Sequence, residues 1–356
     1  MTARQRKISA IVRNLLEWYP KNARDLPWRR TQDPYAIWVS EIMLQQTQVK
    51  TVVPFWERWM RELPTIQAAA KARPEKIHKL WEGLGYYSRA RNSQKAAQII
   101  VKEHGGKFPK EFKAALALPG IGRYTAGAIC SIAFHQPTPI LDGNVIRVLT
   151  RVFGIGENPR KPETNRLLWQ IAEQSVWMAK SAGKNSFSHL NQALMELGAL
   201  ICLPRNPQCG ICPVRNLCFG LRNNCIERLP NLGKRRAATV RRFVAFVVRR
   251  NGKYLVRQRP AGVVNAHLWE FPNVEVNGEK RDATAIFRSQ FGFLAELRPL
   301  CALRHSITRY RITIEAFRVE AARRPAIPGG IWRTKRQLQR LAFNSAHKKI
   351  LGCVSP

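Results

Sequence analysis

Four cysteines in one short segment could bind a metal centre. They are spaced C-x6-C-x2-C-x5-C, as Cys202, Cys209, Cys212 and Cys218. Thiolates this close repel one another unless a metal neutralises them, and tetrahedral sulfur ligation suits both zinc and iron–sulfur clusters. The loop is rich in proline and turn residues and has little apolar surface to fix it. The spacing therefore indicates a [4Fe–4S] cluster. Zinc is the main alternative, although zinc ribbons usually carry two C-x2-C pairs, and four unrelated core cysteines are the third.

Two carboxylates in apolar surroundings could supply an acid and an anion. Glu41 lies in the string WVSEIM and Asp142 in PILDGN, in a chain with only 23 acidic residues. A protonated carboxyl can give its proton to a leaving group, while an ionised one stabilises nearby positive charge. The residues alone leave ordinary alternatives open, with Glu41 as a solvated helix glutamate and Asp142 as the N-cap of a helix over residues 145–152.

A glycine-rich turn is expected between two helices within about residues 111–130. The string LPGIGRYTAGA places Gly120 and Gly122 in this turn. Glycine permits φ > 0 at both positions and leaves backbone N–H groups uncovered at a helix N-terminus, where they can hold a phosphate. A plain connection between two packed helices fits the turn equally well.

The charge balance favours a polyanionic partner. Lys and Arg number 60 against 23 Asp and Glu, a net charge of +37 over 356 residues, so nucleic acid is the expected partner. A membrane-surface protein is the alternative, but no run of about 18 apolar residues could span a bilayer. The eight cysteines suit a reducing compartment better than a disulfide framework, so a cytoplasmic location is expected.

The chain length predicts two domains. Residues 1–225 show apolar residues at intervals of three and four, which predicts a mostly α-helical domain. A basic linker is expected over 226–240. Residues 241–356 predict a mixed α/β module, with a hairpin signal at Asn251-Gly252 and a second β-rich stretch over 307–319.

Five strings occur in the order seen in MutY-type adenine DNA glycosylases. They are WVSEIMLQQTQV, GLGYYSRARN, LPGIGRYTAGA, LDGNVIRVLTR and the four-cysteine loop. The hairpin, Asp142 and the cysteines resemble the helix-hairpin-helix glycosylase superfamily, whereas MLQQTQV, GLGYY and the C-terminal module resemble MutY in particular. The resemblance implies a monomer with one [4Fe–4S] cluster that excises adenine paired with 8-oxoguanine or guanine in double-stranded DNA. A catalytically silent DNA-damage-binding protein on the same fold is the alternative.

The resemblance also implies catalytic roles. Glu41 would protonate adenine N7, Asp142 would stay ionised beside the sugar, and Asn144 and Tyr124 would support Asp142 and the intermediate. The related endonuclease III enzymes carry a Schiff-base lysine at the position of Tyr124. Because tyrosine cannot form that adduct, a monofunctional glycosylase that leaves an intact abasic site is expected.

A base inside a duplex is shielded, so the enzyme must flip adenine out and fill the space it leaves. By resemblance, Gln46 and Tyr86 are the residues that insert into the duplex, and Arg29 lines the adenine pocket. The hairpin would contact the DNA backbone through Gly120, Gly122 and Arg123.

The C-terminal module resembles the MutT-like, Nudix-fold domain with which MutY reads 8-oxoguanine. The expected helix region around 283–293 has no glutamate to hold magnesium, so recognition without hydrolysis is expected. The family often reads Phe-Ser-His in its lesion-contacting loop, where this chain has Ile307-Thr308-Arg309. Thr308 keeps a hydroxyl for the lesion, while the loss of the phenyl and imidazole groups predicts altered or weaker discrimination.

Overall fold

The computed structural model describes residues 1–356 except 184, 234–236, 277–281, 308, 326 and 355–356. The chain forms two compact units. The helical unit comprises residues 1–71 and 92–235, and the sheet unit comprises 72–91 and 236–356. Among the described residues, no helix is both long enough and apolar enough to cross a membrane.

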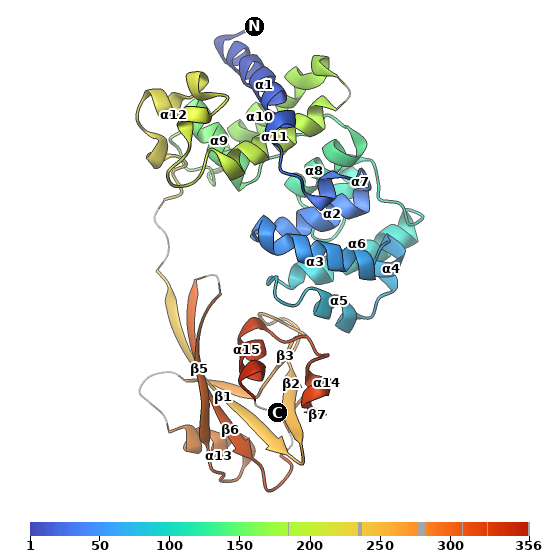
Figure 1. Cartoon of the computed structure of the whole chain (residues 1–356), viewed down its shortest axis with the longest axis vertical. Coiled ribbons are helices and arrows are strands. Elements are labelled where there is room, and N and C mark those ends of the chain that lie inside the picture. The colour runs from blue at the N-terminus through green and yellow to red at the C-terminus, as the bar shows by residue number, and fades with distance from the viewer. Residues whose placement is uncertain (184, 234–236, 277–281, 308, 326, 355–356) are drawn as a thin grey trace. The chain divides into compact units, whose positions relative to one another are not determined.

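The helical unit is a set of packed helices and short 3₁₀ turns (Figure 1). Its elements are α1 (Ala3–Asn22), η1 (Pro27–Arg29), α2 (Pro34–Leu44), α3 (Val49–Glu62), α4 (Ile66–Lys71), most of α6 (Ser88–Glu103), α7 (Phe112–Leu116), α8 (Arg123–Phe134), α9 (Gly143–Phe153), α10 (Pro162–Met178), η2 (Ala179–Ala182), α11 (Ser186–Leu200), η3 (Cys209–Ile211), η4 (Arg215–Leu217), α12 (Phe219–Arg222) and η5 (Ile226–Arg228).

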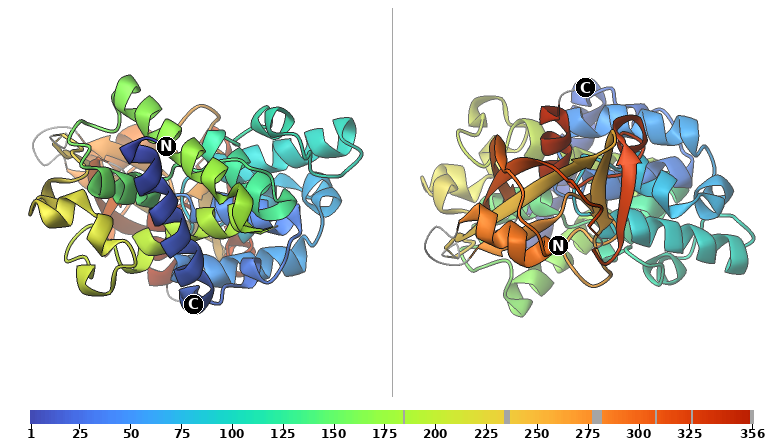
Figure 2. Two further views of the ribbon diagram at one scale, coloured as in Figure 1. Left: turned by 90° about the horizontal axis from the view of Figure 1, so that it is seen from above. Right: turned by 90° about the horizontal axis from the view of Figure 1, so that it is seen from below.

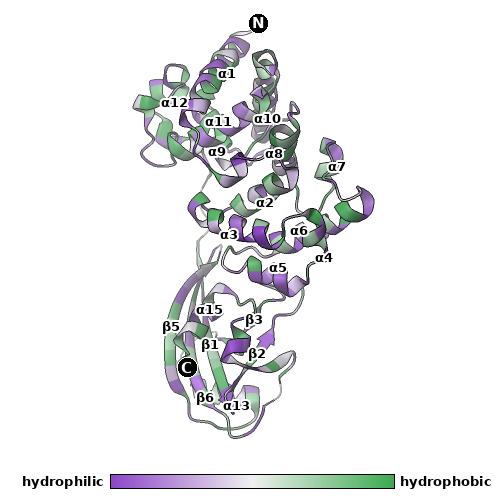
Figure 3. Ribbon diagram, turned by 45° about the vertical axis from the view of Figure 1, so that its right-hand side comes forward, coloured by the Kyte–Doolittle hydropathy of each residue, from purple (hydrophilic) through white to green (hydrophobic). Residues whose placement is uncertain are grey.

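The core of this unit follows the helical periodicity of the sequence. In α1, Ile8, Ile11, Val12 and Leu15 recur at intervals of three and four and are all buried. They pack in one cluster with apolar residues of α9, α10 and α11. Hydrophobic residues also dominate α8 (Figure 3), whose positions 125–131 are all buried. This core fixes the ends of α8, α9 and α11, where the polar residues of interest lie.

The expected helix-turn-helix is present, with α7 before the turn and α8 after it. Gly120 has φ +80°, and a Cβ there would lie 2.8 Å from the Cβ of Asn92. Gly122 differs from the expectation of a positive φ, because it is the extended N-cap of α8 with φ −93°. Only Gly120 therefore needs glycine for its backbone conformation.

The sheet unit contains a seven-stranded mixed sheet. Its elements are α5 (Pro74–Leu80), the start of α6, β1 (Thr239–Arg250), β2 (Lys253–Gln258), β3 (Trp269–Glu270), β4 (Asn273–Val276), α13 (Ala283–Phe291), β5 (Arg298–Ile307), β6 (Tyr310–Glu320), β7 (Gly330–Thr334), α14 (Lys335–Leu338) and α15 (Ser345–Cys353). The main path is β3-β2-β1-β6-β5, with β4 on β1 and β7 on β2. β1 and β6 are parallel over the whole stretch from Thr239↔Tyr310 to Arg249↔Glu320.

The predicted hairpin joins β1 to β2. Arg250 pairs with Lys253, and both Asn251 and Gly252 have positive φ, as the two-residue turn requires. The sheet is covered on both faces (Figure 2). Alternate residues of β1 face opposite ways, so that Val244 and Phe246 pack on α13, whereas Ala245 and Val247 lie in the cluster containing α15.

Candidate active site

One cavity in the helical unit brings together eight of the residues singled out from the sequence. They are Arg29, Glu41, Gln46, Gly122, Arg123, Tyr124, Asp142 and Asn144. They come from η1, α2, the segment after α2, and the N-terminal ends of α8 and α9. Two carboxylates more than a hundred positions apart in the chain thus face the same cavity.

Glu41 is held inside the protein by the helix that carries it. Every residue from Tyr35 to Met43 in α2 is buried, and Glu41 is 5% exposed. The alternative of a solvated helix glutamate is therefore wrong. Burial raises the pKa of Glu41 to about 7, against a lowering by the hydrogen bond from Tyr124. The carboxyl can thus hold a proton near neutral pH.

Tyr124 donates a hydrogen bond to Glu41. Its hydroxyl lies 2.5 Å from Glu41 Oε2, to which it donates, and 3.3 Å from the sulfur of Met195. Burial and the neighbouring carboxylates raise the pKa of Tyr124 well above its ordinary value, so the phenol remains a donor. The resemblance associates Tyr124 with Asp142, whereas its hydrogen bond in the structure goes to Glu41 and leaves the other Glu41 oxygen to carry the proton.

Asp142 combines the capping role and the cavity position that the sequence left as alternatives. As the N-cap of α9, its Oδ1 accepts the N–H of Val145 at 2.7 Å. Its Oδ2 accepts the side-chain amide of Asn144 at 3.0 Å. Burial raises the pKa of Asp142, but these N–H donors act in the opposite direction because they favour the ionised form. Such donors favour Asp142 as the anion of the pair and Glu41 as the acid.

The orientation of Asn144 is itself fixed from two sides. Its Oδ1 accepts from Arg147 at 2.8 Å. On the α11 side, Gly198 leaves room for it, because a Cβ there would lie 2.6 Å from the Cβ of Asn144. The close approach of α9 and α11 therefore holds the amide against Asp142.

An ion-pair group that the sequence analysis did not identify forms another wall of the cavity. Glu196 is fully buried and accepts both Arg24 and Arg29 at 2.8 Å. Burial opposes ionisation, but the arginine hydrogen bonds together lower the pKa of Glu196 to about 2. It is a permanent anion that orients Arg29. The signal was present, since Glu196 lies in the apolar string ALMELGAL and meets the criterion that singled out Glu41.

The residues predicted to contact DNA differ in their surroundings. Arg123 stacks 3.8 Å above the Trp169 ring and pairs with Glu173 at 2.6 Å. Gln46 lines the cavity with φ +59°. Tyr86 belongs to the sheet unit, where its side chain is 44% exposed. Thr308 lies outside the described residues.

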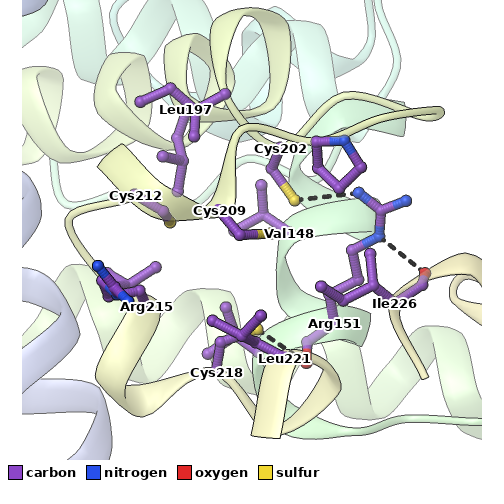
Figure 4. A pocket seen from close by; sticks show the side chains of 14 residues that line it. Val148, Arg151, Leu197, Cys202, Cys209, Cys212, Arg215, Cys218, Leu221 and Ile226 are labelled. Carbon is purple, nitrogen blue, oxygen red and sulfur yellow. Dashed lines mark hydrogen bonds between the residues drawn. The ribbon is translucent and has the colours of Figure 1, made fainter. Parts of the chain in front are cut away.

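The four cysteines line a second, apolar pocket of the helical unit (Figure 4). Apolar side chains from α9, α11 and α12 complete its wall, among them Val148, Leu197 and Leu221. Burial raises the pKa of Cys212 to about 12 and also raises those of Cys209 and Cys218. These three thiols become good ligands only when a metal centre displaces their protons.

The pocket fits an iron–sulfur cluster better than a single ion. Among the residues with described positions, no three or more histidine, cysteine, aspartate or glutamate side chains are grouped so that they could hold one metal ion. A zinc ion needs every sulfur about 2.3 Å from one point, whereas each cysteine of a [4Fe–4S] cluster binds a different iron. Buried Arg151 places its guanidinium 3.4 Å from the Cys202 sulfur and bonds the Leu203 carbonyl at 2.6 Å. Its positive charge would balance a cluster ligated by four thiolates.

Comparison with known proteins identifies the domains and the cysteine loop. Residues 39–174 match the HhH-GPD superfamily of base excision DNA repair proteins, 202–218 the iron–sulfur binding domain of endonuclease III, and 244–352 the NUDIX domain. The adenine DNA glycosylase of Rattus norvegicus is 36% identical, with 96% of this chain and 77% of that protein aligned. The adenine DNA glycosylase of Homo sapiens is 34% identical, over 97% of this chain and 74% of that protein.

Solved structures share the fold of the helical unit. A thermostable thymine-DNA glycosylase superposes with a TM-score of 0.56 at 29% identity, covering 62% of this chain and 100% of its own. A trapped endonuclease III–DNA covalent intermediate shares the fold, with a TM-score of 0.52 at 21% identity over 63% of this chain and 99% of its own. The fold and the site define a base excision DNA N-glycosylase of the helix-hairpin-helix class. Within that class, the chain belongs to the adenine DNA glycosylase family, and the cofactor prediction of one [4Fe–4S] cluster is confirmed by the match of the cysteine loop.

Proposed function

We propose that this enzyme removes adenine paired with 8-oxoguanine or guanine, by means of Glu41 as the acid and Asp142 as the anion. The observation that carries the proposal is the shared cavity, in which a carboxyl whose pKa is about 7 lies with a carboxylate held by N–H donors. Cleavage of an N-glycosidic bond needs a proton on the departing base and negative charge near the sugar. Glu41 supplies the proton, and Asp142 supplies the negative charge.

In this mechanism Glu41 donates its proton to N7 of the flipped adenine while the glycosidic bond breaks. The bonding electrons leave with the base, and the sugar acquires oxocarbenium character. Asp142 stabilises C1′ of the sugar, by resemblance through a covalent intermediate that water then hydrolyses. Tyr124 keeps Glu41 oriented, and Asn144 keeps Asp142 oriented. Arg29, held by Glu196, lies at the wall where the adenine would bind.

The enzyme is proposed to be monofunctional, with Tyr124 in place of a Schiff-base lysine. Gln46 and Tyr86 would enter the duplex, and the Gly120–Arg123 turn would contact its backbone. Residues 202–218 would hold the cluster. The cluster would fix the loop that carries basic residues, and it would take no part in proton transfer. The domain boundaries at 225 and 241, the cytoplasmic location, the monomeric state and the lesion contact by Thr308 belong to the same proposal.

Single-turnover excision on A:8-oxoG and A:G duplexes tests the proposal. Adenine release should be faster opposite 8-oxoguanine, and borohydride should trap little covalent complex. Equal rates on the two mispairs would refute lesion reading, and abundant trapped product would refute the monofunctional assignment.

A further inference from the structure

The turn that carries Tyr86 has an unusual backbone. Gly83, Gly85 and Tyr86 have φ values of +115°, +73° and +47°. A left-handed conformation is costly for a non-glycine residue and persists only where the surroundings enforce it. The surroundings therefore hold the backbone of this turn, including that of Tyr86, in a defined conformation.

Arg89 fixes the turn from within. Its guanidinium is bonded to the carbonyls of Leu84 and Gly85 at 3.3 and 3.2 Å. It also lies 5.6 Å from the centre of the Tyr86 ring, and burial lowers its pKa to about 10. Such a cation beside the ring orients the aromatic side chain without covering it.

Glu82 anchors the same turn to the C-terminal end of the sheet unit. Its side chain is 5% exposed. Oε1 accepts the backbone N–H of Phe343 at 2.9 Å, and Oε2 accepts Lys348 and Lys79, each at 2.8 Å. Burial opposes ionisation, but the two lysine hydrogen bonds and the Phe343 N–H lower the pKa of Glu82. A buried carboxylate with three donors is a strong tether, because its removal leaves those donors unpaired.

Further bonds join the same two parts of the sheet unit. Lys79 also donates to the carbonyl of Leu341 at 3.0 Å, and Arg91 donates to that of Ala266 at 3.2 Å. One cavity of this unit is lined by Tyr86 together with His305 and Ile307, which lead into the loop expected to contact the lesion. The anchored turn and the end of β5 that leads into this loop therefore line the same cavity.

We propose that Glu82 is a positioning residue for mispair discrimination, which couples Tyr86 to the C-terminal module through Phe343 and Lys348. The inference rests on the proposed function, because that function assigns Tyr86 to insertion into the duplex and Thr308 to the lesion contact. Loss of the tether should uncouple the two contacts. The chemistry in the Glu41 cavity does not depend on it, so excision opposite guanine should be nearly unaffected.

The test compares Glu82→Ala and Glu82→Gln with Glu75→Gln, a matched control on the same segment whose glutamate is exposed. Single-turnover rates are measured on A:8-oxoG and A:G, and hydrogen–deuterium exchange is followed in peptides covering 83–87 and Phe343. Lys348→Met, at a half-exposed position, serves if the alanine variant does not fold.

The ratio of the A:8-oxoG rate to the A:G rate should fall about tenfold in Glu82→Ala, since a hydrogen bond to a charged group is lost. The fall should be smaller in Glu82→Gln and Lys348→Met, and absent in Glu75→Gln, with faster exchange in both peptides. An unchanged ratio, or an equal fall on both duplexes, would overturn the proposal. If the parent enzyme itself has a ratio near one, the proposed lesion reading is refuted. In that case the tether is still tested by hydrogen–deuterium exchange, and exchange in the Glu82 variants at the parent rates would overturn it.

Discussion

The Tyr124→Phe substitution tests how the protein tunes its catalytic acid. The phenol donates at 2.5 Å to Glu41 Oε2, and this bond favours the ionised carboxylate. Burial raises the pKa of Glu41 to about 7 in the presence of the bond. Because excision needs the protonated form, the parent rate should fall as pH rises through about 7.

Removal of the phenol oxygen should shift this fall to higher pH. A hydrogen bond to a charged group contributes about 1.5–3 kcal/mol, and about 1.4 kcal/mol corresponds to one pH unit in a titration midpoint. The basic limb of the single-turnover profile should therefore move up by at least about one pH unit. The plateau rate can fall at the same time, since the phenyl ring no longer orients the carboxyl.

Tyr19→Phe is the matched control. The Tyr19 hydroxyl is bonded to Gln192 at 3.0 Å rather than to Glu41, so its loss should leave the midpoint in place. A Tyr124→Phe midpoint equal to that of the parent, or below it, would show that the phenol does not set the protonation of Glu41.

Three further outcomes follow from the packing and the charges. Gly198→Ala should lower the melting temperature and slow excision, because overpacking against Asn144 costs about 1–3 kcal/mol. Gly156→Ala, where a Cβ meets open space, should match the parent in melting temperature and excision rate. Equal behaviour of the two variants would contradict the close approach of α9 and α11. Cys212→Ser should lose iron and visible absorbance while Cys225→Ser keeps both; full iron in the first would remove Cys212 from the ligand set. Glu41→Gln should be as stable as the parent at pH 4 and more stable at pH 8.5, by up to about 3 kcal/mol. The reason is that the raised pKa of Glu41 makes the parent lose stability as the pH rises from the ordinary pKa of this group toward about 7. A melting-temperature difference that is the same at both pH values would contradict this.

Local patterns in the sequence predicted local structure well. Asn251-Gly252 formed the expected hairpin, because a two-residue turn depends on the residues within it. Glu41 stood out as an acid inside an apolar helix, and the structure buries it. The prediction of a positive φ at Gly122 is wrong, because its neighbours in the sequence do not distinguish an N-cap from a left-handed turn.

Long-range pairing could not be predicted in this way. Glu82 lies in a string that reads only as an aromatic turn, and its partners Phe343 and Lys348 are 261 and 266 positions away. Glu196 carried the same apolar signal as Glu41, but its role depends on Arg24 and Arg29, 172 and 167 positions away. No periodicity encodes such contacts, since they depend on how the helices and strands pack.

The most direct test of the central claim is adenine release by Glu41→Gln under single-turnover conditions at pH 7, on a duplex containing A:8-oxoG. Glutamine keeps the shape of the side chain and an acceptor for Tyr124, but it has no proton to donate. The variant should bind the duplex as the parent does and release almost no adenine. Release at the parent rate would contradict the assignment of Glu41 as the acid and, with it, the division of roles between the two carboxylates.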